Sequence, residues 1–159
     1  MLSIKKILLP TDGSSHSFEA LRYASSFARE FNITIYLLTV IEIHHSIYDA
    51  YADEITIDMQ ESRIAALVNQ RLDETEKKAR EMGIKNIQKI SRFGSPYHEI
   101  VKFAEETGID LIVIATHGRS GISHFLIGSV TEKIIRTAPC PVLVVRPNVQ
   151  GLISENKGS

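Results

Sequence analysis

Apolar residues follow two different spacings along this chain. Nearly continuous runs of aliphatic and β-branched residues occupy positions 33–41 and 110–116, and shorter runs occupy 4–9, 87–92 and 141–146. Such runs are typical of strands in a parallel sheet whose two faces are both covered by helices. We therefore predict five strands, of which the one at 87–92 has the weakest pattern.

Between these runs, apolar residues recur three and four positions apart, as on one face of a helix. This spacing predicts helices from Ser14 to about residue 28, from Met59 to Met82, from Pro96 to Thr107 and from Ser129 to Thr137. The apolar positions that mark the long second helix are Met59, Ile64, Leu67, Val68, Leu72, Ala79 and Met82.

The ends of two helices are marked by residues that favour such positions. Asp58 is expected to cap the second helix, and Gly83 is expected to close it. Ser95 provides a cap for the third helix and Pro96 a proline at its first position, and we expect that helix to end at Gly108.

Strands and helices alternate along the whole chain, which predicts right-handed crossovers between parallel strands. The expected fold is a doubly wound, Rossmann-like α/β domain with an open five-stranded parallel sheet and helices on both faces. We assign this single domain to residues 1–147 and predict a flexible tail at 148–159.

In an open parallel sheet, ligands bind beyond the carboxyl ends of the strands. The segments 10–13, 39–41 and 115–121 are predicted to meet there. In the last segment a glycine, Gly118, precedes nine residues and then Gly128-Ser129, which opens a helix. Free amides at a helix start bind phosphate, so this loop and helix can enclose an anion. The alternative is a capping box formed by Ser129 and Glu132.

These segments resemble the universal stress protein family, in its ATP-binding branch, over nearly the whole chain. The resemblance rests on ILLPTDGS at the start, on Gly94-Ser95-Pro96, and above all on ATHGRSGISHFLIGSVTEKIIRTAPCPVLVVRP. The ATP signature of the family is Gly, two residues, Gly, nine residues, then Gly with Ser or Thr. Ala115 replaces the first glycine here, and if backbone approaches the ribose at that point, the added methyl weakens binding.

The resemblance implies an adenine nucleotide alpha hydrolase-like fold that holds ATP. Asp12 is expected at the ribose hydroxyls or on a Mg²⁺ or Mn²⁺ ion, and its alternative role is an Asx-turn after the first strand. The residues implied at the adenosine are Pro10, Thr11, Asp12 and Val40, the last through its backbone. Those implied at the phosphates and the loop beside them are Ala115, His117, Gly118, Arg119, Gly128, Ser129, Val130 and Thr131.

His117 and Arg119 are equally compatible with a structural or solvent-facing role. Other candidates are weaker. His44-His45 lack the partners of a zinc site, and Tyr48 and Tyr51 fit surface packing better than a lid over a base.

Charge and cysteine content limit the alternatives. Eighteen basic and nineteen acidic side chains give a net charge of −1, which provides no broad attraction for nucleic acid or an anionic membrane. No apolar run approaches the roughly 18 residues of a membrane span, and the first apolar run is too short for a signal peptide. The lone Cys140 excludes an intramolecular disulfide and fits a buried small hydrophobe, so we expect a cytoplasmic protein.

The leading hypothesis is an ATP-binding stress-response or regulatory protein. Neither GxxxxGK[ST] nor GxGxxG nor GxSxG occurs, so no motif supplies fast phosphoryl transfer. The first alternative is a slow ATPase or nucleotide hydrolase that uses Asp12 and His117. The second is a nucleotide-free interaction module. The apolar edge strand also predicts a homodimer, which the resemblance places at Val142, Leu143, Val144 and Val145.

Overall fold

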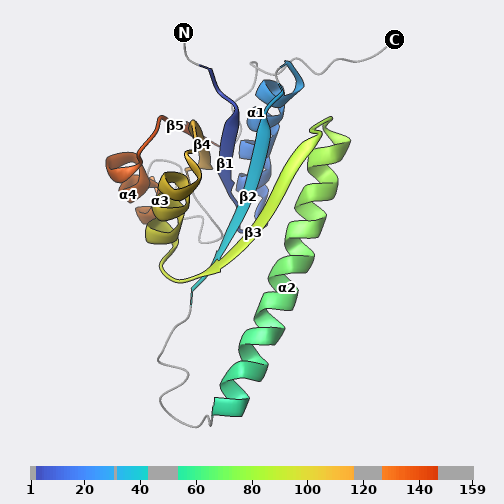
Figure 1. The fold of residues 1–159 in the computed structure, drawn as a ribbon, viewed down its shortest axis with the longest axis vertical. Helices are drawn as coiled ribbons and strands as arrows, with labels where there is room; N and C mark the ends of the chain where they lie inside the picture. The colour runs from blue at the N-terminus through green and yellow to red at the C-terminus, as the bar shows by residue number, and fades with distance from the viewer. Residues whose placement is uncertain (1–2, 31, 43–53, 117–126, 147–159) are drawn as a thin grey trace.

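A computed structural model describes residues 3–30, 32–42, 54–116 and 127–146 (Figure 1). Five strands and four helices alternate in this part of the chain. In order they are β1 (Lys6–Pro10), α1 (Ser15–Glu30), β2 (Thr34–Ile41), α2 (Glu54–Glu81), β3 (Asn86–Phe93), α3 (Pro96–Thr107), β4 (Leu111–Ala115), α4 (Ser129–Thr137) and β5 (Val142–Val145).

All five strands pair in parallel, in the order β3-β2-β1-β4-β5. The chain therefore adds strands on one side of β1 up to β3 and then crosses to the other side for β4 and β5. The predicted doubly wound α/β sheet is confirmed. The reversal of strand order falls between β1 and β4, which is where such sheets bind ligands at their carboxyl edge.

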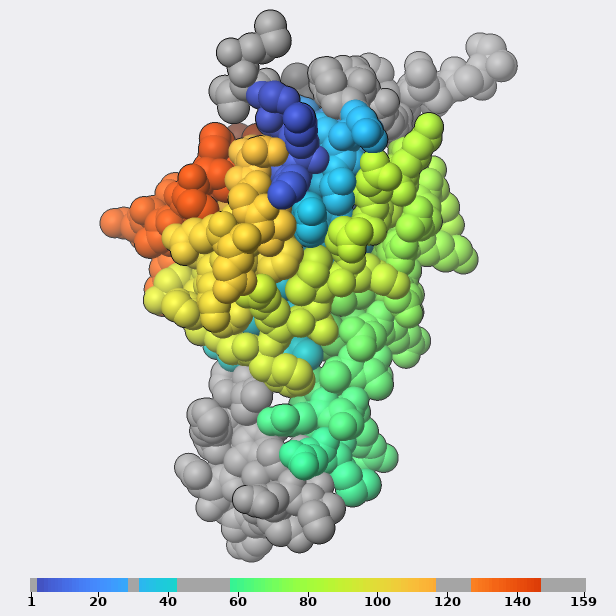
Figure 2. All heavy atoms as spheres, viewed as in Figure 1, coloured from blue at the N-terminus to red at the C-terminus, as the bar shows by residue number. Residues whose placement is uncertain are grey.

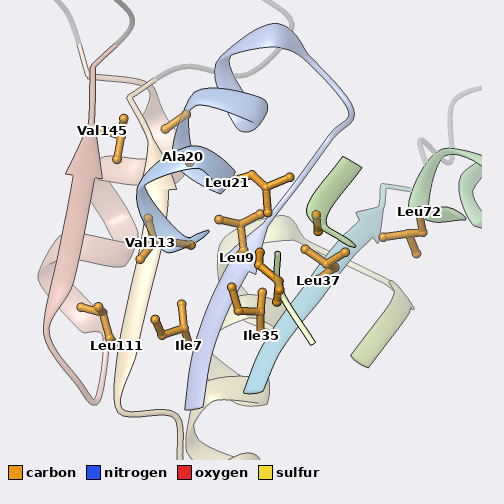
Figure 3. Packing of buried hydrophobic residues seen from close by; sticks show 14 of the residues in the cluster. Ile7, Leu9, Ala20, Leu21, Ile35, Leu37, Leu72, Leu111, Val113 and Val145 are labelled. Carbon is orange, nitrogen blue, oxygen red and sulfur yellow. The ribbon is translucent and has the colours of Figure 1, made fainter. Parts of the chain in front are cut away.

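Alternate residues of the strands face two separate cores. Ile7 and Leu9 of β1 lie with α1 and α2 on one face, as Figure 3 shows, whereas Leu8 lies with α3 and α4 on the other. The side chains of Ile7, Leu8 and Leu9 are all fully buried. Burial on both faces explains why these strands read as continuous apolar runs rather than as alternating ones.

The long helix α2 extends beyond the sheet. Figure 1 shows its first half passing the end of the sheet at which β2 ends, and Figure 2 shows the green atoms of this half well beyond α3 and α4. Val68 and Leu72 pack into the core, whereas Met59, Ile64 and Leu67, which follow the same helical period, are exposed. Met59 and Ile64 belong to the half of the helix that extends past the sheet. Leu67 is next to the buried Val68 but points about 100° away from it around the helix.

The predicted helix ends are partly correct. Ser95 holds the N-cap position of α3 without a side-chain cap hydrogen bond, and Gly108 ends the helix in a left-handed conformation, as expected. Gly83, with a φ of 90°, follows α2. The predicted cap at Asp58 is wrong, because α2 already begins at Glu54. Its apolar periodicity only starts at Met59, so the preceding turn gave no signal.

We expect Leu72→Ala and Leu67→Ala to differ sharply in stability, although both change the same residue type on α2. Leu72 is 2% exposed, so its truncation leaves a cavity and lowers the free energy of unfolding by about 2–5 kcal/mol. Leu67 is 58% exposed, so its truncation changes stability by less than about 0.5 kcal/mol. Urea unfolding measures both, and equal losses would contradict the described packing.

In the four described ranges, no helix is long and apolar enough to cross a membrane.

Candidate functional site

The turn after β1 is held by a compact set of hydrogen bonds. The buried Thr11 donates its backbone N–H to the carbonyl of Leu38 at 2.9 Å. Its hydroxyl donates to Oγ of Ser17 at 3.1 Å and accepts the N–H of Gly13 at 3.2 Å. The carbonyl of Thr11 accepts the hydroxyl of Thr39 at 2.8 Å, which ties the end of β2 to this turn.

Asp12 forms the Asx-turn that its alternative role predicted. Its Oδ1 accepts the N–H of Ser14 at 2.9 Å, and Gly13 between them has a φ of 74°, which disfavours a side chain. One carboxylate oxygen is thus engaged in shaping the turn. The expected roles at ribose or metal concern the same carboxylate and are compatible with this bond, because a carboxylate accepts several hydrogen bonds.

The side chain of Ser14 caps the N-terminus of α1. Ser14 Oγ accepts the N–H of Ser17 at 3.3 Å, and the Ser17 hydroxyl donates to the carbonyl of Ser14 at 2.8 Å. The side chain of Ser14 therefore takes a donor that would otherwise face the crevice. This leaves α1 less suited to an anion than a helix without such a cap.

Val40 lies near the end of β2, at the same edge as this turn. Pro10 pairs with Leu38 in the β1–β2 register, so Val40 is two residues further along the neighbouring strand. Its side chain is half-buried and packs against the α3 and α4 core. The predicted adenosine residues Pro10, Thr11, Asp12 and Val40 are therefore neighbours at the carboxyl edge.

Gly94 of the Gly94-Ser95-Pro96 motif has a structural role at this edge. Its N–H donates to the carbonyl of Ile41 at 3.0 Å, which joins the turn after β3 to the end of β2. Its φ is 143°, and a Cβ there would lie 3.0 Å from Cγ of Glu99. A side chain at this position is therefore both strained and crowded.

The end of β4 and the start of α4 are joined directly. The N–H of Gly128 donates to the carbonyl of Thr116 at 2.8 Å, and the buried Thr131 hydroxyl donates to the carbonyl of Ala115 at 3.0 Å. Thr116 in turn donates its N–H to the carbonyl of Val145 on β5 at 3.0 Å. These hydrogen bonds fix Thr116 and Gly128, the residues at which β4 and α4 meet.

The first turn of α4 has no side-chain cap among the described residues. Its N-cap is Gly128, whose carbonyl accepts the N–H of Glu132 at 2.9 Å, and no side chain of a described residue caps the helix. The predicted capping box is wrong, because Ser129 is the first helical residue and not the cap. Since helix geometry gives the amides of Ser129, Val130 and Thr131 no intrahelical acceptor, they can bind an anion.

The methyl group of Ala115 faces away from α4. Ala115 is buried in the core beneath α1 with Val113 and Val145, whereas Ile114 packs on the α4 side. Adjacent strand residues point to opposite faces. The alanine that replaces the first signature glycine thus fills the core and does not occupy the space in front of the α4 amides.

We expect Ala115→Gly to lower the free energy of unfolding by about 1–2 kcal/mol, because it removes a buried methyl and adds backbone entropy to the unfolded chain. Because the methyl faces the core, nucleotide affinity should change by less than about twofold. Urea unfolding and calorimetric titration test the two halves of this prediction. Markedly tighter binding by the glycine variant would contradict it.

Cys140 is partly buried and packs against the α3 and α4 core, as predicted for a small hydrophobe. Burial raises the pKa of its thiol, which keeps it protonated and a poor nucleophile at neutral pH.

Besides Cys140, the described groups with shifted pKa values lie on α2, β3 and α3. Lys89 binds Asp73 and Glu76, each at 2.6 Å, and Lys89 followed by Arg80 lowers the pKa of Glu76. Arg92 binds Glu106 at 2.7 Å and lowers the pKa of that carboxyl in the same way. These exposed ion pairs join neighbouring elements and contribute modestly to stability above the ordinary carboxyl pKa.

His117, Gly118 and Arg119 lie outside the described residues, as do His44-His45, Tyr48 and Tyr51. In the part of the chain that is described, no group of three His, Cys, Asp or Glu side chains could hold a metal ion. Ser17, whose hydroxyl lies between Thr11 and Ser14, was not predicted to contribute, whereas Thr39 belongs to the segment 39–41 that was predicted to meet at this edge.

The sequence profile of the Universal stress protein family matches residues 3–146. The chain belongs to the universal stress protein family. One member, Universal stress protein MJ0531 of Methanocaldococcus jannaschii, is 38% identical over 142 residues, which are 89% of this chain and 82% of that protein.

Solved structures share the fold of this chain. The structure of the hypothetical protein MJ0577 is 32% identical, with a TM-score of 0.78, and the match covers 89% of this chain and 95% of that one. A universal stress protein in complex with cAMP is 24% identical, with a TM-score of 0.68, and the match covers 91% and 98% of the two chains. This last likeness shows the shared fold.

Proposed function

We propose that this universal stress protein binds an adenine nucleotide, with ATP as its ligand, and acts as a stress-response or regulatory protein. The observation that carries the proposal is the start of α4. Its first amides have no cap from a described side chain, and two hydrogen bonds hold the helix against the end of β4. The α1 start at the same edge is capped by Ser14.

The ligand would span the edge from β2 to α4. Pro10, Thr11 and Val40 would contact the adenosine, and Asp12 would bind the ribose hydroxyls or a Mg²⁺ or Mn²⁺ ion whose other ligands include phosphate oxygens. The phosphates would lie at the amides of Ser129, Val130 and Thr131. The resemblance also assigns His117, Gly118 and Arg119 to the phosphates. The family member solved with cAMP supports a ligand of this chemical class.

We also propose that the protein is a cytoplasmic homodimer joined through β5. Val142, Leu143 and Val144 are only half-buried, and Ile135 on the adjacent α4 is 46% exposed. The opposite edge strand, β3, instead carries Lys89 and Arg92 in ion pairs, and charges of this kind discourage pairing between strand edges. Because Val145 accepts the Thr116 N–H, the proposed interface borders the nucleotide loop.

Calorimetric titration with AMP, ATP and Mg-ATP tests this function, with adenosine as the comparison that lacks a phosphate. We expect all three nucleotides to bind and AMP to bind more tightly than adenosine. Absence of binding at millimolar Mg-ATP would leave the nucleotide-free module as the better account. Metal-dependent ATP hydrolysis that is lost in Asp12→Ala would instead favour the slow hydrolase.

A further inference from the structure

Thr131 is the third residue of α4, and its side chain points into the protein. The residue is 4% exposed, and its hydroxyl donates to the carbonyl of Ala115 at 3.0 Å. A buried hydroxyl without a partner is costly, so this bond fixes the side-chain rotamer. The hydroxyl is consequently turned toward β4, while only the backbone N–H of the residue remains for a ligand at the helix start.

Among the described residues, a second hydrogen bond joins the start of α4 to the end of β4. It runs from the N–H of Gly128 to the carbonyl of Thr116 at 2.8 Å. Because that donor is occupied, Gly128 has no amide to offer a phosphate. The two bonds attach the helix to the sheet at its cap and at its third residue, one turn apart, and so define the direction in which the first amides point.

We propose that Thr131 is a positioning residue for phosphate, whose hydroxyl holds the α4 start on β4 so that the amides of residues 129–131 face the ligand. The inference rests on the proposed nucleotide function and adds a role for one side chain. It predicts that the Thr131 hydroxyl contributes to the affinity for phosphate and nothing to the affinity for adenosine. The carbonyl of Ala115 therefore affects phosphate binding indirectly, because it accepts the hydrogen bond that orients the start of α4.

Thr131→Val removes the hydroxyl at nearly constant shape, and Thr131→Ser keeps it. Thr75→Val is a matched control, because Thr75 is also buried at 2% exposure and donates to the carbonyl of Arg71 within α2. Calorimetric titrations with AMP and with adenosine are compared for each variant. We expect Thr131→Val to lose about tenfold in AMP affinity, the scale of one buried hydrogen bond, with adenosine binding unchanged. Thr131→Ser and Thr75→Val should bind both ligands as the wild type does.

Unchanged AMP binding by Thr131→Val would overturn the inference, as would equal losses for AMP and adenosine. If the wild type binds neither ligand, the proposed function itself fails. Should Thr131→Val not fold, NMR of the wild type still decides. Saturation with AMP should shift the amide of Thr131 and leave its Cβ signal in place, whereas a large Cβ shift would mean that the hydroxyl leaves Ala115 for the phosphate.

Discussion

Ser129→Asp is expected to weaken nucleotide binding about 100-fold while leaving the fold intact. Ser129 is exposed at the first position of α4, so an aspartate fits there without disturbing the core. Its carboxylate would stand where the phosphate is proposed to bind. Repulsion between unit charges 4 Å apart is about 1–4 kcal/mol at a protein surface, so we expect AMP affinity to fall about 100-fold. The same charge favours the helix N-terminus by about 0.3–1 kcal/mol, so thermal stability should hold or rise.

Ser95→Asp provides the matched control for this variant. Ser95 is exposed at the start of α3 and makes no side-chain cap hydrogen bond there, so the substitution adds the same charge to another helix start. Calorimetry should give wild-type AMP affinity for Ser95→Asp and an affinity about 100-fold weaker for Ser129→Asp. Wild-type affinity in Ser129→Asp would exclude phosphate binding at α4.

Val144→Lys is expected to convert the proposed dimer into monomers. Val144 lies in the middle of the exposed β5 edge, where it is half-buried, so a long side chain can extend its charge into water in the monomer. In a dimer joined through β5, two such charges would be buried close together, which costs several kcal/mol. Analytical ultracentrifugation should give the mass of one chain.

Gln88→Lys is the control on the other edge strand, where the side chain is already exposed. It should leave the sedimentation of the wild type unchanged. Circular dichroism should give the same helix content for both variants. A dimer that persists in folded Val144→Lys would mean that the copies associate through another surface.

Much of the fold was predictable because local signals agreed with tertiary packing. Helix α3 begins at Pro96 and ends before Gly108, as expected, since proline and glycine favour those positions on backbone grounds alone. The start of α2 was mispredicted because the apolar period that marks the helix begins only at Met59, five residues after Glu54. Met59 follows this period and yet is exposed, because the first half of the helix extends past the sheet.

The sequence predicted where the candidate site lies in the fold, but not which way its side chains point. The spacing from Gly118 to Gly128 marked the helix start, yet Ser129 and Glu132 also matched a capping box that the structure does not form. The inward turn of the Thr131 hydroxyl depends on how α4 packs on β4, which no local pattern records. The face of the sheet toward which the Ala115 methyl points could have been predicted, because alternate strand residues share a face and Ala115 is two residues after Val113.

NMR titration of the ¹⁵N-labelled protein with AMP tests the central claim most directly. The account predicts that the amide signals of Ser129, Val130 and Thr131 shift together and saturate, while the capped amide of Ser17 at the start of α1 moves little. Saturating shifts concentrated elsewhere, with the amides of residues 129–131 unmoved, would contradict it.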